Sequence, residues 1–151
     1  MANNNFYQQN RNVKNNQQKN QPESAYDKFK SLTFSISWIE KGADESMIKF
    51  AEEAGKYMAK NGLTNSKIRS IYGEIKRIQM GKFENEKISF YLLRPKVAYT
   101  LGRDERNRGL QLFKLIFDKA AVAVRTEKDF NHFCNLLEAI LAYHRANGGK
   151  D

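Results

Sequence analysis

The chain has 151 residues, with 26 Lys and Arg residues against 17 Asp and Glu residues, and its formal net charge is +9 at pH 7. A single cysteine excludes a disulfide framework within the chain, and no apolar run approaches the ~20 residues that a membrane helix needs. The polar start MANNNFYQQN has no apolar signal core, so we expect a protein of the reducing cytoplasm.

The basic charge is concentrated in the middle of the chain. Residues 66–119 hold thirteen basic and six acidic residues, so this segment alone contributes +7 of the net charge of +9. Such a concentration indicates a basic patch rather than a uniformly basic surface. A basic patch predicts an anionic partner, which could be a nucleic acid, a membrane surface or an acidic protein, although many soluble proteins are basic for solubility alone.

Residues 1–22 are rich in Asn and Gln and hold three basic residues and no acidic ones. A segment of this composition buries too little apolar surface to offset the entropy cost of ordering, so we expect a disordered arm. The arm acts either as a solubilising tail or as a weakly basic segment that touches RNA. We expect residues 23–151 to form a single helical-bundle domain.

Residues 23–43 are ambiguous, because the run 31–39 within them carries two conflicting patterns. The aromatic residues Phe34 and Trp38 alternate with serines, as in a strand, whereas Leu32 and Ile36 have helical spacing. The period alone does not decide the structure of so short a run. We favour a short helix, because nothing nearby in the sequence offers a partner strand.

Five amphipathic segments follow, and capping or stop residues bound them. They span about residues 44–61, 64–81, 84–101, 104–123 and 126–147. Asp44 and Thr64 are the predicted N-caps of the first two segments, and Thr126 with Asp129 resembles a capping box. The short connections between the segments predict an all-α fold, a compact bundle of about five helices.

The stretch LRPKVAYTLGRDERNRGL, residues 93–110, combines apolar residues with four arginines and one lysine. Pro95 lacks a backbone donor and disfavours helix at Arg94, so we predict a kink or a break there. Beyond the break, we expect Val97 to pack inward while the basic side chains turn outward. Asp104 is predicted to start the next helix, near the positive end of its dipole.

In the segment 64–81, four isoleucines fall on one arc of a helix and predict its buried face. Arg69 and Lys76 share one flank of that helix beside Gly73, where a backbone could approach closely. Lys67 lies on the opposite flank. The alternative interpretation is a solvated face with an ordinary basic bias.

No set of residues in the sequence matches a catalytic or metal site. There is no Gly-rich loop with Lys-Ser or Lys-Thr to hold a phosphate. Cys134 lies on the apolar arc of the last helix and is predicted to be buried, while His132 points to a different face. His144 is predicted to be packed or to face a partner. We therefore expect no enzyme activity, no metal and no cofactor.

Three blocks of the sequence, in their order and spacing, resemble one known family. The blocks are SKIRSIYGEI (residues 66–75), LRPKVAY followed by GR (93–103), and EAILAYH followed by GG (138–149). They resemble the small subunit of the type III-A CRISPR–Cas effector, the Csm complex, and the resemblance covers about residues 44–149. Residues 1–22 and 31–39 lie outside its pattern.

The resemblance implies an all-helical, cytoplasmic subunit of antiviral defence without nuclease activity of its own. Several copies would stack as an inner filament beside the backbone subunits that hold the guide RNA. Together they would line the groove where guide RNA and target RNA pair. RNA cleavage would belong to the backbone subunit, and DNA cleavage and cyclic-nucleotide synthesis to the large subunit. The resemblance implies no membrane partner.

The resemblance also implies RNA-facing positions at the basic residues of its blocks, which are Lys67, Arg69, Arg94, Lys96 and Arg103. Charge and helical neighbourhood add four more, which are Lys76, Arg77, Arg106 and Arg108. We expect these residues to contact phosphates independently of RNA sequence. Six phosphate contacts would give a log–log slope of affinity against salt of roughly −4, at ~0.7 per contact on a single strand.

Two other classes of protein compete with this interpretation. A basic helical adaptor would dock an acidic protein surface with the same patch and would not contact nucleic acid. A small helical enzyme is the third class, but the sequence offers it no acid, base, nucleophile or metal set.

Overall fold

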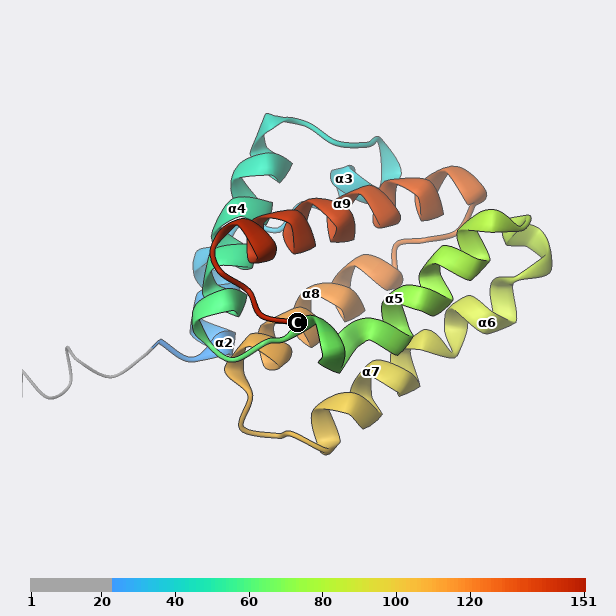
Figure 1. Ribbon diagram of the computed structural model, residues 1–151. Coiled ribbons are helices and arrows are strands. Elements are labelled where there is room, and N and C mark those ends of the chain that lie inside the picture. The colour runs from blue at the N-terminus through green and yellow to red at the C-terminus, as the bar shows by residue number, and fades with distance from the viewer. Residues whose placement is uncertain (1–22) are drawn as a thin grey trace, which may run out of the picture.

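The computed structural model describes residues 23–151 and shows a bundle of helices (Figure 1). Its elements are α2 (Ala25–Ser31), α3 (Ser37–Glu40), α4 (Glu45–Lys60), α5 (Asn65–Met80), the 3-10 helix η1 (Phe83–Asn85), α6 (Lys87–Tyr91), α7 (Leu93–Gly102), α8 (Arg108–Ala121) and α9 (Glu127–Ala146). Within residues 23–151, β-type pairing is limited to an isolated parallel bridge between Thr64 and Lys150. The all-α prediction is confirmed, and the predicted disordered arm, residues 1–22, lies outside the described residues.

An aromatic cluster joins η1 and α6 to the two C-terminal helices. Its members are buried phenylalanines from four elements, namely Phe83, Phe90, Phe117, Phe130 and Phe133. Neighbouring rings have centroids 5.2–6.2 Å apart, several of them in edge-to-face geometry. Such pairs contribute about 0.5–1.5 kcal/mol each beyond the burial of their area. The cluster therefore holds the inner face of α6 against the core.

Helix α4 packs against both α8 and α9, and its crossing with α9 is close. Gly55 lies at this crossing, where an added Cβ would stand 2.6 Å from the backbone nitrogen of His144 and 2.7 Å from the carbonyl oxygen of Ile140. The absence of a side chain at Gly55 is what allows the two helix backbones to approach. Real Cβ atoms do not tolerate such distances, and packed interiors leave little room for adjustment.

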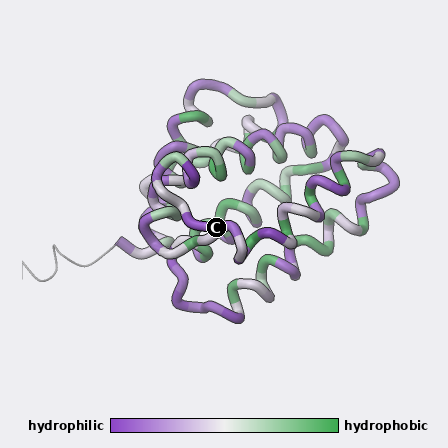
Figure 2. The backbone as a smooth tube through the Cα atoms, in the orientation of Figure 1, coloured by the Kyte–Doolittle hydropathy of each residue, from purple (hydrophilic) through white to green (hydrophobic). Residues whose placement is uncertain are grey.

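Helices α5 and α7 lie side by side at one edge of the bundle (Figure 1). The predicted isoleucine line of α5 is buried, and Leu93 and Val97 of α7 are buried as well. The outer surfaces of both helices remain open to solvent. The connection that leads from α7 to α8 is strongly hydrophilic, as the hydropathy colouring in Figure 2 shows. This edge is where most of the basic excess of the sequence lies.

The prediction of a short helix for the ambiguous N-terminal stretch is only partly right: α2 ends at Ser31, α3 begins at Ser37, and residues 32–36 between them are neither helix nor strand. Trp38 is buried, with its ring centroid 4.9 Å from that of Phe50 on α4. The indole nitrogen of Trp38 donates a hydrogen bond to Asp44 Oδ1 over 3.0 Å, and the same oxygen accepts from the backbone nitrogen of Met47 over 2.9 Å. Asp44 is therefore the N-cap of α4, as predicted. The capping box of Thr126 and Asp129 is also present at the start of α9.

The helix break that the sequence predicted at Arg94 and Pro95 is found a little earlier in the chain. The turn at Leu92 separates α6 from α7, and Arg94 and Pro95 are both helical. Pro95 therefore occupies the first turn of α7, where the backbone nitrogens have no acceptor within the helix and its missing N–H costs little. The prediction of a break was correct, but its position was too late in the chain. Helix α7 begins at Leu93, so Pro95 falls within the first turn, where a proline is tolerated.

The predicted start of the fourth helix at Asp104 is wrong. Helix α8 begins at Arg108, and Asn107 is its N-cap, with Oδ1 accepting from the backbone nitrogen of Leu110 over 2.9 Å. Asp104 lies in the turn before α8, where its Oδ2 accepts from the side-chain nitrogen of Asn107 over 3.0 Å. Several residues in this segment can cap a helix, and the choice depends on where α8 packs.

Candidate nucleic-acid interface

The predicted cations of α5 are divided between two flanks of the helix. Lys67 lies on the flank that faces α7, and Arg69 lies on the flank that faces α9. This division agrees with the helical-wheel prediction from the sequence. Each flank borders its own groove, which we call the α5–α7 groove and the α5–α9 groove.

The α5–α7 groove brings polar and basic side chains of two helices together. It has a volume of about 370 Å³ and is lined by Lys67, Ser70, Tyr99, Thr100, Arg103 and Asp104. The guanidinium carbon of Arg103 lies 5.9 Å from the centre of the Tyr99 ring, which is within reach of a cation–π interaction. The Tyr99 side chain is exposed. The groove therefore offers two cations and three hydroxyl groups to a bound molecule.

One carboxylate, Asp104, belongs to the lining of this groove. Its Oδ2 lies 3.0 Å from Nζ of Lys67. The hydrogen bond from Asn107, and after it the ammonium of Lys67, hold the pKa of Asp104 below its usual value, so the carboxylate is ionised at neutral pH. Asp104 thus offsets part of the Lys67 charge and positions its ammonium at the groove, while Arg103 has no ion pair within residues 23–151.

Lys96 extends the basic surface along α7. It is exposed, and the carbonyl oxygen of Lys96 accepts a 2.9 Å hydrogen bond from the hydroxyl of Thr100 one turn later. The pKa of Glu74 on the facing side of α5 is lowered chiefly by its hydrogen bond to Arg77, and the charge of Lys96 contributes. Lys96 is therefore electrostatically coupled to α5, beside the groove that Lys67 and Arg103 line.

The α5–α9 groove is larger and mostly apolar. It has a volume of about 520 Å³ and is lined by Asn65, Ile68, Arg69, Tyr72, Gly73, Glu138, Leu141 and Ala142. A Cβ added to Gly73 would meet nothing within 4 Å, so the predicted open position beside Arg69 is present. Lys76 lies at this groove but is engaged, with Nζ 2.5 Å from Oε1 of Glu138 and 5.2 Å from the centre of the Tyr72 ring.

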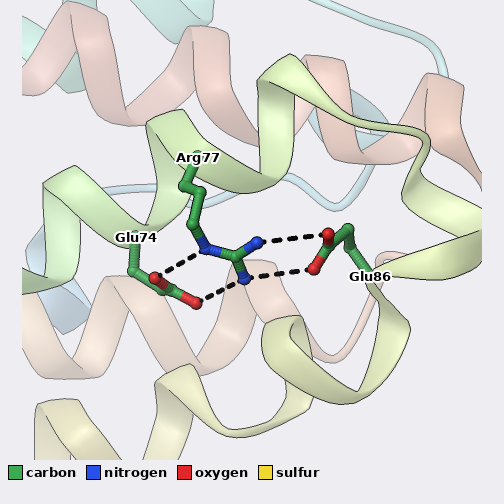
Figure 3. Close-up of polar contacts among 3 residues, drawn as sticks. All are labelled: Glu74, Arg77 and Glu86. Carbon is green, nitrogen blue, oxygen red and sulfur yellow. Dashed lines mark hydrogen bonds and ion pairs between the residues drawn. The ribbon is translucent and has the colours of Figure 1, made fainter.

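Arg77 is the most fully engaged of the predicted site residues. Its guanidinium donates to both carboxylate oxygens of Glu74, over 3.1 and 2.7 Å, and to both oxygens of Glu86, over 3.1 Å each (Figure 3). These hydrogen bonds, the Glu74 pair first, raise the pKa of Arg77, and they lower the pKa of both carboxyl groups. The arrangement ties α5 to the residue that precedes α6.

The remaining predicted cations lie apart from the α5–α7 groove. Arg94 borders a different groove, between α7 and α8, and its Nε lies 3.8 Å from Asp118 Oδ1. Arg106 and Arg108 are exposed at the start of α8 and make no ion pair within the described part of the chain. Of the nine residues, only Lys67 and Arg103 line the α5–α7 groove, and Lys96 lies one helical turn before Thr100 of that groove.

Sequence reasoning did not select Ser70 and Thr100, whose hydroxyl groups line the same groove as Lys67 and Arg103. A weak signal exists, because Ser70 follows Lys67 by three residues and Arg103 follows Thr100 by three, so each pair shares a helix face. The sequence did not show that these two faces belong to helices that lie against each other.

The residues considered for catalysis or metal binding are packed against the core. Cys134 is buried, and burial raises the pKa of its thiol to about 12. His132 Nδ1 lies 2.7 Å from the carbonyl oxygen of Ile39, and His144 Nε2 lies 2.7 Å from that of Leu63. His144 is fully buried, so of its two predicted environments the structure shows the packed one. Residues 23–151 hold no group of three or more His, Cys, Asp or Glu residues that could bind a metal ion.

Among residues 23–151, no helix combines the length and the apolar character needed to cross a membrane.

Comparison with known proteins identifies the family. The family model described as Csm2 Type III-A matches residues 41–150, which include α4 to α9 and both grooves of α5. No curated protein and no solved structure matches the chain. The match covers most of the sequence and agrees with the resemblance carried by the three sequence blocks. The chain therefore belongs to the Csm2 family and is a structural subunit of a type III-A CRISPR complex.

Proposed function

We propose that the α5–α7 groove and the basic surface beside it bind the phosphate backbone of guide RNA and target RNA in the assembled complex. The observation that carries this proposal is the convergence of Lys67 from α5 and Arg103 from α7 on one groove with three hydroxyl groups. The guanidinium fork of arginine matches phosphate oxygens, and hydroxyl groups donate to phosphate or sugar oxygens. None of these contacts depends on the identity of a base.

The proposed contacts fall into two groups of different accessibility. Lys67 and Arg103 line the groove and Lys96 is exposed beside it, whereas Arg69, Arg94, Arg106 and Arg108 are exposed elsewhere on the molecule. Lys76 and Arg77 are already bound to carboxylates, so a phosphate would have to compete with Glu138, or with Glu74 and Glu86. We infer that these two residues contribute through the positive field of the edge more than through direct contacts.

Family membership extends the proposal to the assembly. We infer that the chain lines the guide–target groove together with further copies of itself, beside the backbone and large subunits, and that RNA and DNA cleavage belong to those subunits. We further infer a cytoplasmic location, and that residues 23–151 act as one folded unit within the complex. The burial of Cys134, whose thiol is held protonated, agrees with a structural role for that residue.

Filter binding of the full-length chain to single-stranded RNA across a salt series tests the groove. The double variant Lys67→Gln/Arg103→Gln is expected to bind more weakly and to lower the steepness of the log–log salt dependence by about 1.4, at ~0.7 for each lost phosphate contact. The matched control is Lys49→Gln/Lys56→Gln, which removes the same charge from exposed positions on α4.

The control should change the salt dependence much less than the groove variant. Equal losses in the two variants would mean that net charge alone drives RNA binding, and an unchanged slope in the groove variant would exclude the groove. In the assembled complex, the groove variant should also retain less RNA than the control.

A second candidate function, the protein-interaction adaptor, is favoured by a different observation. The outer face of α6 and α7 exposes large apolar side chains, which a purely RNA-facing surface does not require. The adaptor expected from the sequence would not contact nucleic acid, so RNA binding that depends on the groove residues would argue against it.

A further inference from the structure

Helices α6 and α7 expose a continuous row of apolar side chains on the face that points away from the bundle. We call this row the outer stripe, and it consists of Ile88, Tyr91, Leu92, Pro95, Ala98 and Tyr99. The exposed fractions of the largest members are 74% for Ile88, 60% for Tyr91, 55% for Leu92 and 67% for Tyr99. The spacing of three or four residues between members keeps the row on one face across the turn at Leu92.

The opposite face of the same helices is also apolar. Phe90, Leu93 and Val97 are buried against the core. A helix that is apolar on all sides belongs in an interior, and a surface helix has a polar outer face. A contiguous exposed apolar patch on a protein therefore marks an interaction site. Helices α6 and α7 are apolar on two opposite faces, and this chain covers only one of those faces.

We propose that the outer stripe is the docking surface for another protein subunit, one whose contact surface is apolar at its centre and acidic at its rim. The rim of the stripe is basic on both sides. Arg94 and Lys114 border the α7–α8 groove on one flank and share a single carboxylate, Asp118, at 3.8 and 2.7 Å. Lys96 is exposed on the other flank. These cations repel a basic partner and complement carboxylates on an acidic one.

The chemistry of the stripe favours a protein over RNA. Ile88 and Leu92 present aliphatic surface with no polar atom, whereas RNA offers phosphates, sugar hydroxyls and the faces of bases. The charge pattern also disfavours a second copy that docks through the same face. A two-fold contact of that kind would place Arg94 and Lys96 of one copy opposite the same residues of the other.

This inference rests on membership in a multi-subunit complex and does not depend on RNA contact in the α5–α7 groove. Tyr99 borders both surfaces, but Ile88 and Leu92 do not line the groove. A neutral substitution at these two positions therefore tests docking without altering the charge that RNA binding requires.

The first experiment measures retention of the full-length chain in the co-expressed and purified complex, relative to the backbone subunit. Ile88→Gln/Leu92→Gln is expected to reduce retention about tenfold, as substitution of residues at the centre of an interface does. The matched control is Ile48→Gln/Val122→Gln, which changes exposed apolar residues on α4 and at the end of α8. RNA binding by the isolated stripe variant should equal that of the unmodified chain.

Retention of the stripe variant at the control level would overturn the proposal. Lys114→Gln tests the acidic rim of the partner, and we expect a loss of retention of about threefold for the loss of one rim contact. Unchanged retention would overturn that part of the proposal.

A photo-crosslinking amino acid at Leu92 of the assembled complex then identifies the occupant. A crosslink to an Asp- and Glu-rich surface of a different subunit supports the proposal, and a crosslink to RNA or to a second copy of this chain overturns it.

Discussion

The crossing of α4 and α9 and the outer edge formed by α5 and α7 are built on opposite principles. At the crossing, Gly55 lets two backbones approach until a single added carbon would overlap the α9 backbone. At the edge, Gly73 of α5 lies on the flank that borders the α5–α9 groove and faces open space. At the crossing, residues of this chain fill all the space between the two helices. The edge has free space, uncovered apolar surface and an excess of positive charge.

This difference shows which part of the molecule serves stability and which part serves assembly. A close-packed contact stabilises the fold because its surfaces are complementary in shape, so a substitution there changes the stability of the fold. An open edge contributes little to folding, so the residues on it are free to be selected for binding. Three substitutions separate the two regions by their effect on the free energy of unfolding.

The largest effect is expected for Gly55→Ala. The new Cβ would lie 2.6–2.7 Å from backbone atoms of His144 and Ile140, which cannot move without shifting α9. We expect a loss of about 1–3 kcal/mol in the free energy of unfolding, as for overpacked cores, despite the better helix propensity of alanine. Urea denaturation followed by circular dichroism measures it. A variant as stable as the unmodified chain would show that the crossing is looser than the structure indicates.

Gly73→Ala is expected to have the opposite sign and a smaller size. The position is helical and open, so alanine gains helix propensity without a clash. The free energy of unfolding should rise by about 0.5–1 kcal/mol in the same urea assay. The pair of alanine substitutions is its own control, because the chemical change is identical. Destabilisation by Gly73→Ala would contradict the open edge.

The smallest effect is expected for Arg77→Met, and it should depend on pH. Arg77 lowers the pKa of Glu74 and Glu86 from the ordinary value of 4.5, so the folded state favours the ionised carboxylates. That contribution to stability is present above pH 4.5 and is lost as the pH falls through the lowered values.

The urea midpoints of Arg77→Met and the unmodified chain should therefore differ slightly at pH 7, and the difference should shrink as the pH falls below 4.5. Arg125→Met, which removes an exposed arginine at the start of α9 that has no ion pair within residues 23–151, serves as the control across the same pH series. A difference that does not shrink in acid would mean that Arg77 stabilises the edge by packing and not by charge.

Much of the fold could be predicted from local patterns. Asp44 and the pair Thr126 and Asp129 cap helices where the sequence placed them, because capping uses only neighbouring residues. The buried faces of α5 and α9 follow from the spacing of their apolar residues. The flanks of Lys67 and Arg69 on α5 were predictable for the same reason.

The errors came where several local choices had similar energies. Either Asp104 or Asn107 could cap α8, and packing decided for Asn107. A proline is accepted at any position of a first helical turn, so Pro95 predicted a break nearby without locating the turn at Leu92. The ion pair between Arg77 and Glu86 could not be predicted from the sequence either, because it depends on the path of the chain through η1.

The sequence by itself determined the helical class, the buried face of each long helix, the basic excess of the middle segment and the resemblance to the family that the comparison then identified. These properties depend on composition and on contacts between near neighbours in the chain. Only the tertiary structure decided that Lys67 and Arg103 share a groove, that Arg77 is held by two carboxylates and that α6 and α7 remain uncovered on one side. Each of these depends on which helices lie against each other, and that arrangement follows from the packing of the whole core.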